Sequence, residues 1–150
     1  MCAEASGAGE VKNSTALILI AVLLLFGLSN RSTPLPIPIV VVDDAPFPSD
    51  GLTVVIVEET ETRMRGELSP GHFAALTSQD VRDAAKKLNA HLRVFDQHTP
   101  TAGMTATEAA AFKLKADSLP WIHISNGKTG FTGPLPDGVE ATIALMGKYK

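Results

Sequence analysis

Acidic and basic side chains are concentrated in one short segment, EETETRMR, which runs from Glu58 to Arg65. It follows an apolar run that begins at Leu52. Ligands of open α/β sheets collect at the carboxyl ends of parallel strands, where carboxylate and guanidinium groups could bind a small substrate. In a solvated loop the same charges would only neutralise one another. The sequence is compatible with both interpretations.

Histidines are common metal ligands, and the chain has four of them: His72, His91, His98 and His123. Their spacing fits no metal-binding motif. The single cysteine, Cys2, is remote from all four in the sequence and leaves the chain without an internal disulfide. We therefore expect no metal site and no cofactor.

Two of these histidines have informative neighbours. His98 follows Asp96 by two residues, which allows either an acid/base pair or a surface ion pair at the end of a strand. His123 alternates with Ile122 and Ile124. Because side chains alternate between the faces of a strand, we expect His123 to point toward solvent or a helix edge.

The charge balance argues against nucleic acid as a partner. The chain carries 13 basic and 16 acidic residues, with a net charge of −3 and no long run of like charges. A nucleic-acid-binding surface would require a basic patch.

An uncharged segment, residues 13–30, follows a polar tail of residues 1–12. As a helix these 18 residues would span roughly 27 Å, close to the thickness of a bilayer core. We predict a single transmembrane helix, or alternatively a cleaved signal peptide. Lys12 and Arg31 flank the segment on opposite sides, so the positive-inside rule does not decide its orientation.

Residues 31–51 form a proline-rich linker, with prolines at 34, 36, 38, 46 and 48. Proline fixes φ, so Pro34–Pro38 predicts an extended, semi-rigid spacer. Ile39–Val42 could form an edge strand, with a loop over residues 43–51. A proline-rich ligand for an aromatic groove is the alternative, although the segment is very apolar for that role.

Residues 52–150 have the pattern of a single α/β domain. Leu52–Glu59 is a β-branched run typical of a central strand, and Thr60–Phe73 is polar and predicts a loop. The elements expected after it are a helix capped by Thr77 or Ser78, a strand at His91–Gln97, and a helix capped by Thr105 or Thr107. The strand, helix, strand order predicts a βαβ unit, in which the strands at Leu52–Glu59 and His91–Gln97 pair in parallel.

The last part of the chain predicts a hairpin and a helix. A strand begins at Trp121, and Asn126-Gly127 is a strong signal for a turn into a returning strand at Lys128–Gly133. Asp137 is placed to cap a closing helix, with Glu140 three residues later.

This order of elements, with Leu119-Pro120-Trp121 opening a strand before a tight hairpin, resembles the thioredoxin-like fold. The resemblance covers residues 52–149 and implies a three-layer sandwich with a mixed central sheet. It also implies a cis peptide bond at Pro120, beside the position of the family's redox site. The family's Cys-x-x-Cys would fall near Glu59–Arg65, where this chain has no cysteine. Thiol–disulfide exchange needs a thiolate, so that activity does not carry over.

Together these features predict a single-pass membrane protein, tethered through residues 13–30, with a non-redox thioredoxin-like domain that binds or scaffolds a protein partner. The alternative is an enzyme that uses the Glu58–Arg65 loop near Pro120 as a substrate cleft. In either case the candidate binding cleft comprises Glu59, Arg63, Pro120 and Trp121.

Overall fold

A computed structural model describes residues 44–150 of the 150-residue chain. The expectations for the tail, for the segment at residues 13–30 and for a strand at Ile39–Val42 lie outside the described residues. Within residues 44–150, no helix is both long enough and apolar enough to cross a bilayer.

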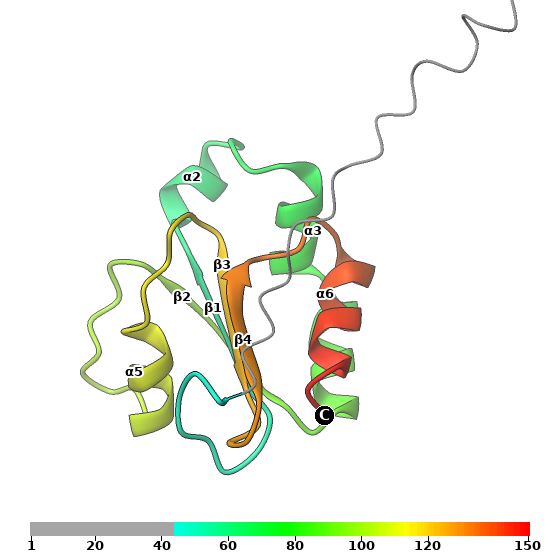
Figure 1. Cartoon of the computed structure of the whole chain (residues 1–150). Helices are drawn as coiled ribbons and strands as arrows, with labels where there is room; N and C mark the ends of the chain where they lie inside the picture. Colours follow the sequence, from blue (N-terminus) through cyan, green and yellow to red (C-terminus); the bar gives the residue numbers. More distant parts are fainter. Residues whose placement is uncertain (1–43) are drawn as a thin grey trace, which may run out of the picture. The chain divides into compact units, whose positions relative to one another are not determined.

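The centre of the domain is a mixed sheet of four strands: β1 (Thr53–Glu58), β2 (His91–Asp96), β3 (Trp121–Ser125) and β4 (Gly130–Pro134). Their order is β2-β1-β3-β4 (Figure 1). β1 pairs in parallel with β2, whereas β3 is antiparallel to both β1 and β4. The α/β class, the central position of β1 and its parallel pairing with β2 were all expected from the sequence, and all are confirmed.

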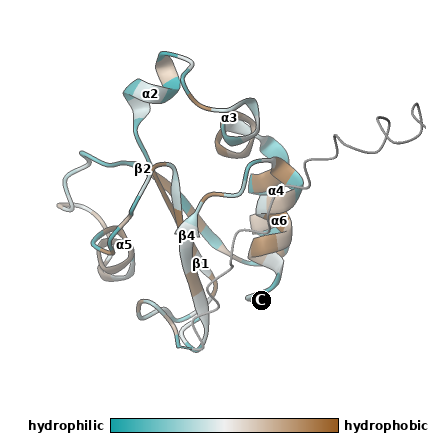
Figure 2. Cartoon of the chain, turned by 45° about the horizontal axis from the view of Figure 1, so that its top comes forward, coloured by the Kyte–Doolittle hydropathy of each residue, from teal (hydrophilic) through white to brown (hydrophobic). Residues whose placement is uncertain are grey.

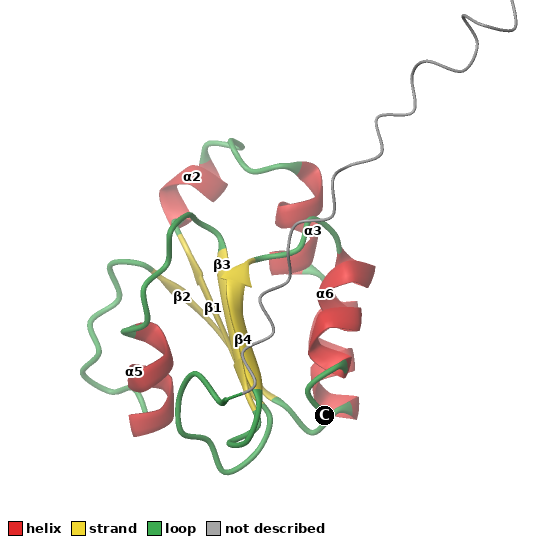
Figure 3. Ribbon diagram, in the orientation of Figure 1, coloured by secondary structure: helices red, strands yellow, loops and turns green. Residues whose placement is uncertain are grey.

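Helices cover both faces of this sheet (Figures 1 and 3). Three lie on one face: α3 (Pro70–Thr77), α4 (Gln79–Lys87) and α6 (Val139–Gly147). The other face is covered by α5 (Ala106–Phe112) and by Phe47 from the segment that precedes β1. A further short helix, α2 (Thr60–Met64), follows directly from the end of β1. The colouring in Figure 2 shows that α2 is polar, whereas α6 is largely apolar.

The side chains of β1 divide between two cores because alternate residues of a strand face opposite ways. Val54 and Ile56 pack with the α3, α4 and α6 side, and Val55 and Val57 pack with α5 and Phe47. All six residues of β1 are buried. The continuous β-branched run therefore reflects burial on both faces.

The predicted loop at Thr60–Phe73 is wrong, because the segment contains α2 and the first turn of α3. Ser69-Pro70 begins a helix: the Ser69 Oγ accepts the His72 N–H at 3.0 Å, and proline at the first helical position needs no N–H partner. The start of α2 is capped from another element, since the Asp96 Oδ2 at the end of β2 accepts the Thr60 N–H at 2.8 Å.

Two of the three expected helix caps are confirmed. Ser78 caps α4, and Thr105 caps α5 in a capping box with Glu108. Asp137 is not a cap: the residue before α6 is Gly138, whose φ of +135° favours glycine. The Asp137 Oδ1 instead accepts a hydrogen bond from the Ser69 Oγ at 2.7 Å, which joins the start of α3 to the segment before α6.

The hairpin between β3 and β4 is confirmed, as is the cis peptide bond between Leu119 and Pro120. The Asn126 side chain closes the turn by accepting the Lys128 and Thr129 amides at 3.0 and 2.8 Å. Gly127 takes a φ of +82°, which an L side chain rarely adopts. The returning strand begins at Gly130, two residues later than expected.

The orientation expected for His123 is wrong, because its side chain is fully buried. It lies on the face opposite Ile122 and Ile124, but this face is covered too. The Trp121 Nε1–H donates to the Thr132 Oγ1 at 3.0 Å, and the hydroxyl in turn lies 2.7 Å from the His123 Nδ1. Since an indole only donates, the hydroxyl accepts from Trp121, and it can bond to either tautomer of the His123 ring through its own proton or its second lone pair. Nε2 is buried without a hydrogen-bond partner among the described residues.

Burial lowers the pKa of His123 from 6.5 to about 4. In the unfolded chain the imidazole binds its proton more tightly, so the domain should lose stability as pH falls from 6.5 to 4. The loss should reach about 3 kcal/mol. Urea unfolding across this range would measure it. His123→Asn, which keeps an acceptor for Thr132 and removes the titrating group, should show a flatter dependence; an equal slope in both proteins would contradict the prediction.

Candidate functional site

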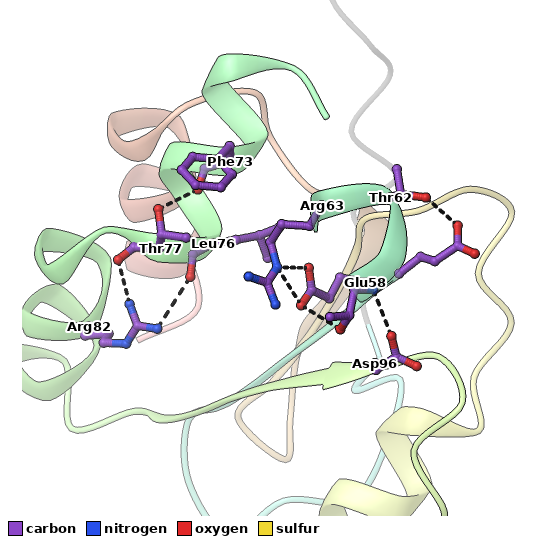
Figure 4. A network of polar contacts seen from close by, with 10 residues as sticks. Glu58, Thr62, Arg63, Phe73, Leu76, Thr77, Arg82 and Asp96 are labelled. Atoms are coloured by element: carbon purple, nitrogen blue, oxygen red, sulfur yellow. Dashed lines mark hydrogen bonds and ion pairs between the residues drawn. The ribbon is translucent and has the colours of Figure 1, made fainter. Parts of the chain in front are cut away.

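The carboxyl end of β1 holds a buried carboxylate. Glu58 is the last residue of the strand and is only 4% exposed. The Nε–H of Arg63 lies 3.0 Å from the Glu58 Oε1 and 2.8 Å from Oε2, so one donor spans both oxygens. α2 creates this contact by turning the chain back over the strand end (Figure 4). The hydrogen bond to Glu58 raises the pKa of Arg63.

A second carboxylate, Asp96, lies at the end of the neighbouring parallel strand β2. Its Oδ2 accepts the Thr60 N–H and its Oδ1 accepts the His98 N–H, both at 2.8 Å. These two backbone hydrogen bonds, Thr60 first, lower the pKa of Asp96. The Asp96 carboxylate therefore contacts the backbone amide of His98 and not its imidazole. This contact does not support the acid/base pair considered from the sequence.

Two adjoining clefts lie beside these groups. The smaller has a volume of about 230 Å³ and is lined by Glu58, Arg63, Leu76, Thr77, Arg82 and Val94. The larger, about 540 Å³, runs along β2 and α4 and shares Leu76, Arg82 and Val94 with the first. Arg82 lines both clefts and donates to the carbonyls of Thr77 and Ser78 at 3.0 Å each, at the C-terminus of α3. Figure 4 shows its contacts with Thr77 and Leu76.

Of the four candidate residues, Arg63 alone lines one of these two clefts. Arg63 lines the smaller cleft, but its carboxylate partner is Glu58, whereas the Glu59 Oε2 accepts from the Thr62 Oγ1 at 2.6 Å. Trp121 pairs with Val57, so Pro120 and Trp121 lie at the same end of the sheet as Glu58. The Trp121 indole, however, bonds to Thr132 on the opposite face. Because side chains alternate between the two faces of β1 and β3, Glu58 with Arg63 lies on one face of the sheet and the Trp121 indole lies on the other.

Several cleft residues were not singled out in the sequence. Leu76, Thr77 and Arg82 come from α3 and α4, which only the fold brings next to the end of β1, and Val94 comes from β2. Asp96 had a usable signal, because it ends a strand predicted to run parallel to β1, and the carboxyl ends of such strands meet at one edge. Arg82 had none, since it is one of several charged residues of an amphipathic helix.

Comparison with protein-family models, curated proteins and solved structures finds no match. The chemistry of the site must therefore be judged from its geometry alone.

No group of three or more metal-ligating side chains comes together within residues 44–150. Three of the histidines bond to separate partners: the His72 Nε2 lies 2.9 Å from the Leu135 carbonyl, His91 contacts Glu108, and His123 contacts Thr132.

The arrangement favours recognition over proton transfer. Both oxygens of Glu58 face the same guanidinium, so the carboxylate has its counter-ion fixed beside it. An efficient general base needs reach to a substrate proton, and this one is occupied. What remains open to a ligand is a polar recess with two guanidinium groups in its wall and an apolar residue, Val94, at its edge.

Removing the guanidinium should test whether this ion pair is structural. Arg63→Met leaves the Glu58 carboxylate buried without a cation, and we expect a loss of about 2 kcal/mol, discounted because the Arg63 side chain is 31% exposed. The double variant Glu58→Gln/Arg63→Met should recover most of this loss. Urea unfolding at pH 7 measures both.

The matched control is Arg65→Met. The Arg65 side chain is exposed and pairs with Glu67 at the surface, so this substitution should change the free energy of unfolding little. If the changes in the free energy of unfolding caused by Glu58→Gln alone and Arg63→Met alone add up to that of the double variant, the two side chains are not coupled. That result would contradict the prediction.

Proposed function

We propose that this chain is a membrane-tethered, non-redox, thioredoxin-like module that binds or scaffolds another protein. One observation carries the binding role. The large hydrophobic side chains exposed within residues 44–150 are Met64, Phe73 and Val94, at 79%, 48% and 37%. They belong to α2, α3 and β2, which line the smaller cleft together with β1 and α4, and Val94 itself lines it. Exposed apolar side chains on the elements that form a polar recess are typical of a protein-binding surface.

The thioredoxin-like assignment is supported by the order and pairing of the elements. Parallel β1 and β2 are separated by helices, an antiparallel hairpin follows α5, and the closing helix α6 packs back on the sheet. The non-redox character is supported by the segment after β1. The family's cysteine pair would lie there, whereas residues 60–64 form α2 without a cysteine.

The membrane tether is supported by the 18 uncharged residues 13–30. Extraction of native membranes at alkaline pH, with the intact mass of the protein, tests this part of the proposal. The full chain should stay with the membrane. Recovery of a soluble form shorter by about 29 residues would identify a cleaved signal peptide instead.

The alternative function, an enzyme that uses the Glu58–Arg65 loop near Pro120, has less support. Its carboxylate is held by Arg63, and the indole of Trp121 bonds on the opposite side of the sheet from that pair.

Site-specific photo-crosslinking in native membranes tests the binding role. A photoreactive residue at Met64, Phe73 or Val94 of the full chain should give a discrete adduct with another protein from at least one position. Exposed positions away from the cleft, Lys115 and Lys128, serve as controls and should give none. No adduct from any of the three test positions, or equal labelling at the controls, would contradict a binding module with this surface.

A further inference from the structure

Among residues 44–150, nothing pairs with the backbone groups on the outer edge of β2. The His91 N–H donates to the Leu52 carbonyl and the Gln97 N–H to the Glu58 carbonyl, each at 2.8 Å. Since every second residue of a strand faces the same neighbour, Arg93 and Phe95 also face β1, and the backbone groups of Leu92 and Val94 face outward. Within residues 44–150 no strand lies beyond β2. Such an edge can accept an added strand.

The groove beside this edge has room for side chains of an added strand. It has a volume of about 540 Å³ and is bounded by Leu92 and Val94 of β2 and by residues of α4. Its apolar lining comes from the core and from both helices that flank it: Ile56, Ala75, Leu76, Val81, Ala85 and Ala90. Alternate residues of a strand paired with β2 would point into this groove, as in recognition by strand addition.

Cations line the edge on both sides, although the whole chain has a net charge of −3. On the groove side are Arg82 and Lys86, and on the other side Arg93 extends toward Glu108, which also contacts the His91 imidazole. Two carboxylates face these groups: Asp83 lies 3.3 Å from the Lys86 Nζ, and Glu108 contacts His91 and Arg93 at 2.9 and 3.3 Å. Arg82 bonds only to backbone carbonyls, which leaves an excess of positive charge.

The opposite edge of the sheet, β4, is less suited to this role. Its last residue, Pro134, has no N–H to donate. Pro46 lies beside Gly130, close enough to contact a Cβ placed there, so the segment before β1 already occupies the start of this strand.

We propose that the outer edge of β2 binds an extended, acidic peptide segment of a partner protein as a fifth strand of the sheet. This inference rests on the proposed function and assigns its partner a chemical class. Backbone hydrogen bonds to Leu92 and Val94 supply the affinity. The residues of the segment that face the groove are apolar at its floor and carboxylates at its rim, where Arg82 and Lys86 lie. On the other face of the added strand a carboxylate meets Arg93.

The test uses the full chain in detergent micelles and a capped eight-residue probe. Every second residue of the probe, the set that faces the groove, is valine and glutamate in turn, with threonine at the positions between them. Amide hydrogen exchange should show new protection at Leu92 and Val94 when the probe is present. A peptide with lysine in place of each glutamate should bind at least about ten times more weakly, and raised salt should lower the affinity of the glutamate probe. A glutamate probe with N-methylated amides on one edge should not protect these residues, because it cannot complete the ladder.

Two variants with the same charge change separate a local from a general effect. Lys86→Glu lies at the groove and should weaken the glutamate probe roughly fivefold, whereas Lys128→Glu, on the exposed hairpin turn, should leave its affinity unchanged. Val94→Pro removes an outward N–H and no N–H that faces β1, and should abolish protection at Leu92.

The proposal is overturned if the probe leaves both amides unprotected, if the lysine peptide binds equally well, or if Leu92 and Val94 are already protected without any peptide. The last result would mean that a second copy or another part of the chain covers the edge. These failures differ from failure of the binding module itself: crosslinks at Met64 or Phe73 with an unreactive β2 edge would leave the proposed function intact.

Discussion

Burial of β1 on both faces is the constraint on which the rest of this structure depends. Six consecutive residues, Thr53–Glu58, are excluded from water, so apolar layers must cover both sides of the sheet. The α3, α4 and α6 helices supply one layer, and α5 with Phe47 supplies the other. Burying this much β-branched surface is a large favourable term, roughly 25 cal/mol for each Å² removed from water. Because the strand is buried along its whole length, the group at its carboxyl end is buried with it.

That end group is a carboxylate, and its charge shapes the elements around it. A buried carboxylate is costly unless a cation and hydrogen bonds compensate for lost hydration. Arg63 provides both for Glu58, and it can do so because α2 reverses the chain within five residues. α2 is too short and too polar to be stable alone. Asp96 holds it by capping Thr60, so the ends of the two parallel strands together position the helix that neutralises one of them.

The sequence predicted the elements whose patterns reflect burial and failed where contacts between distant segments decide the structure. β1, α4 and the β3–β4 hairpin follow from β-branched residues, an amphipathic spacing and Asn126-Gly127. α2 was missed because its cap is Asp96, which lies 36 residues away. His123 was placed wrongly because alternation indicates which face a residue occupies, and says nothing about whether that face is covered. Glu58 and Glu59 were indistinguishable in the sequence, and only the pairing with Arg63 separates them.

β2 shows why a strand can be well ordered and still be suited to binding. Of its six residues only Phe95 is buried, so packing alone holds it weakly. It is fixed instead by its hydrogen bonds to β1 and by Glu108 of α5, which contacts both His91 and Arg93. The contact with His91, with further hydrogen bonds from Thr105, lowers the pKa of Glu108 to about 2, so this carboxylate stays charged at neutral pH. The same residue completes the capping box of α5, and it thereby joins the helix to the strand through polar contacts on one side. No segment of residues 44–150 pairs with the outer side of β2, and a fifth strand would add the burial that β2 lacks.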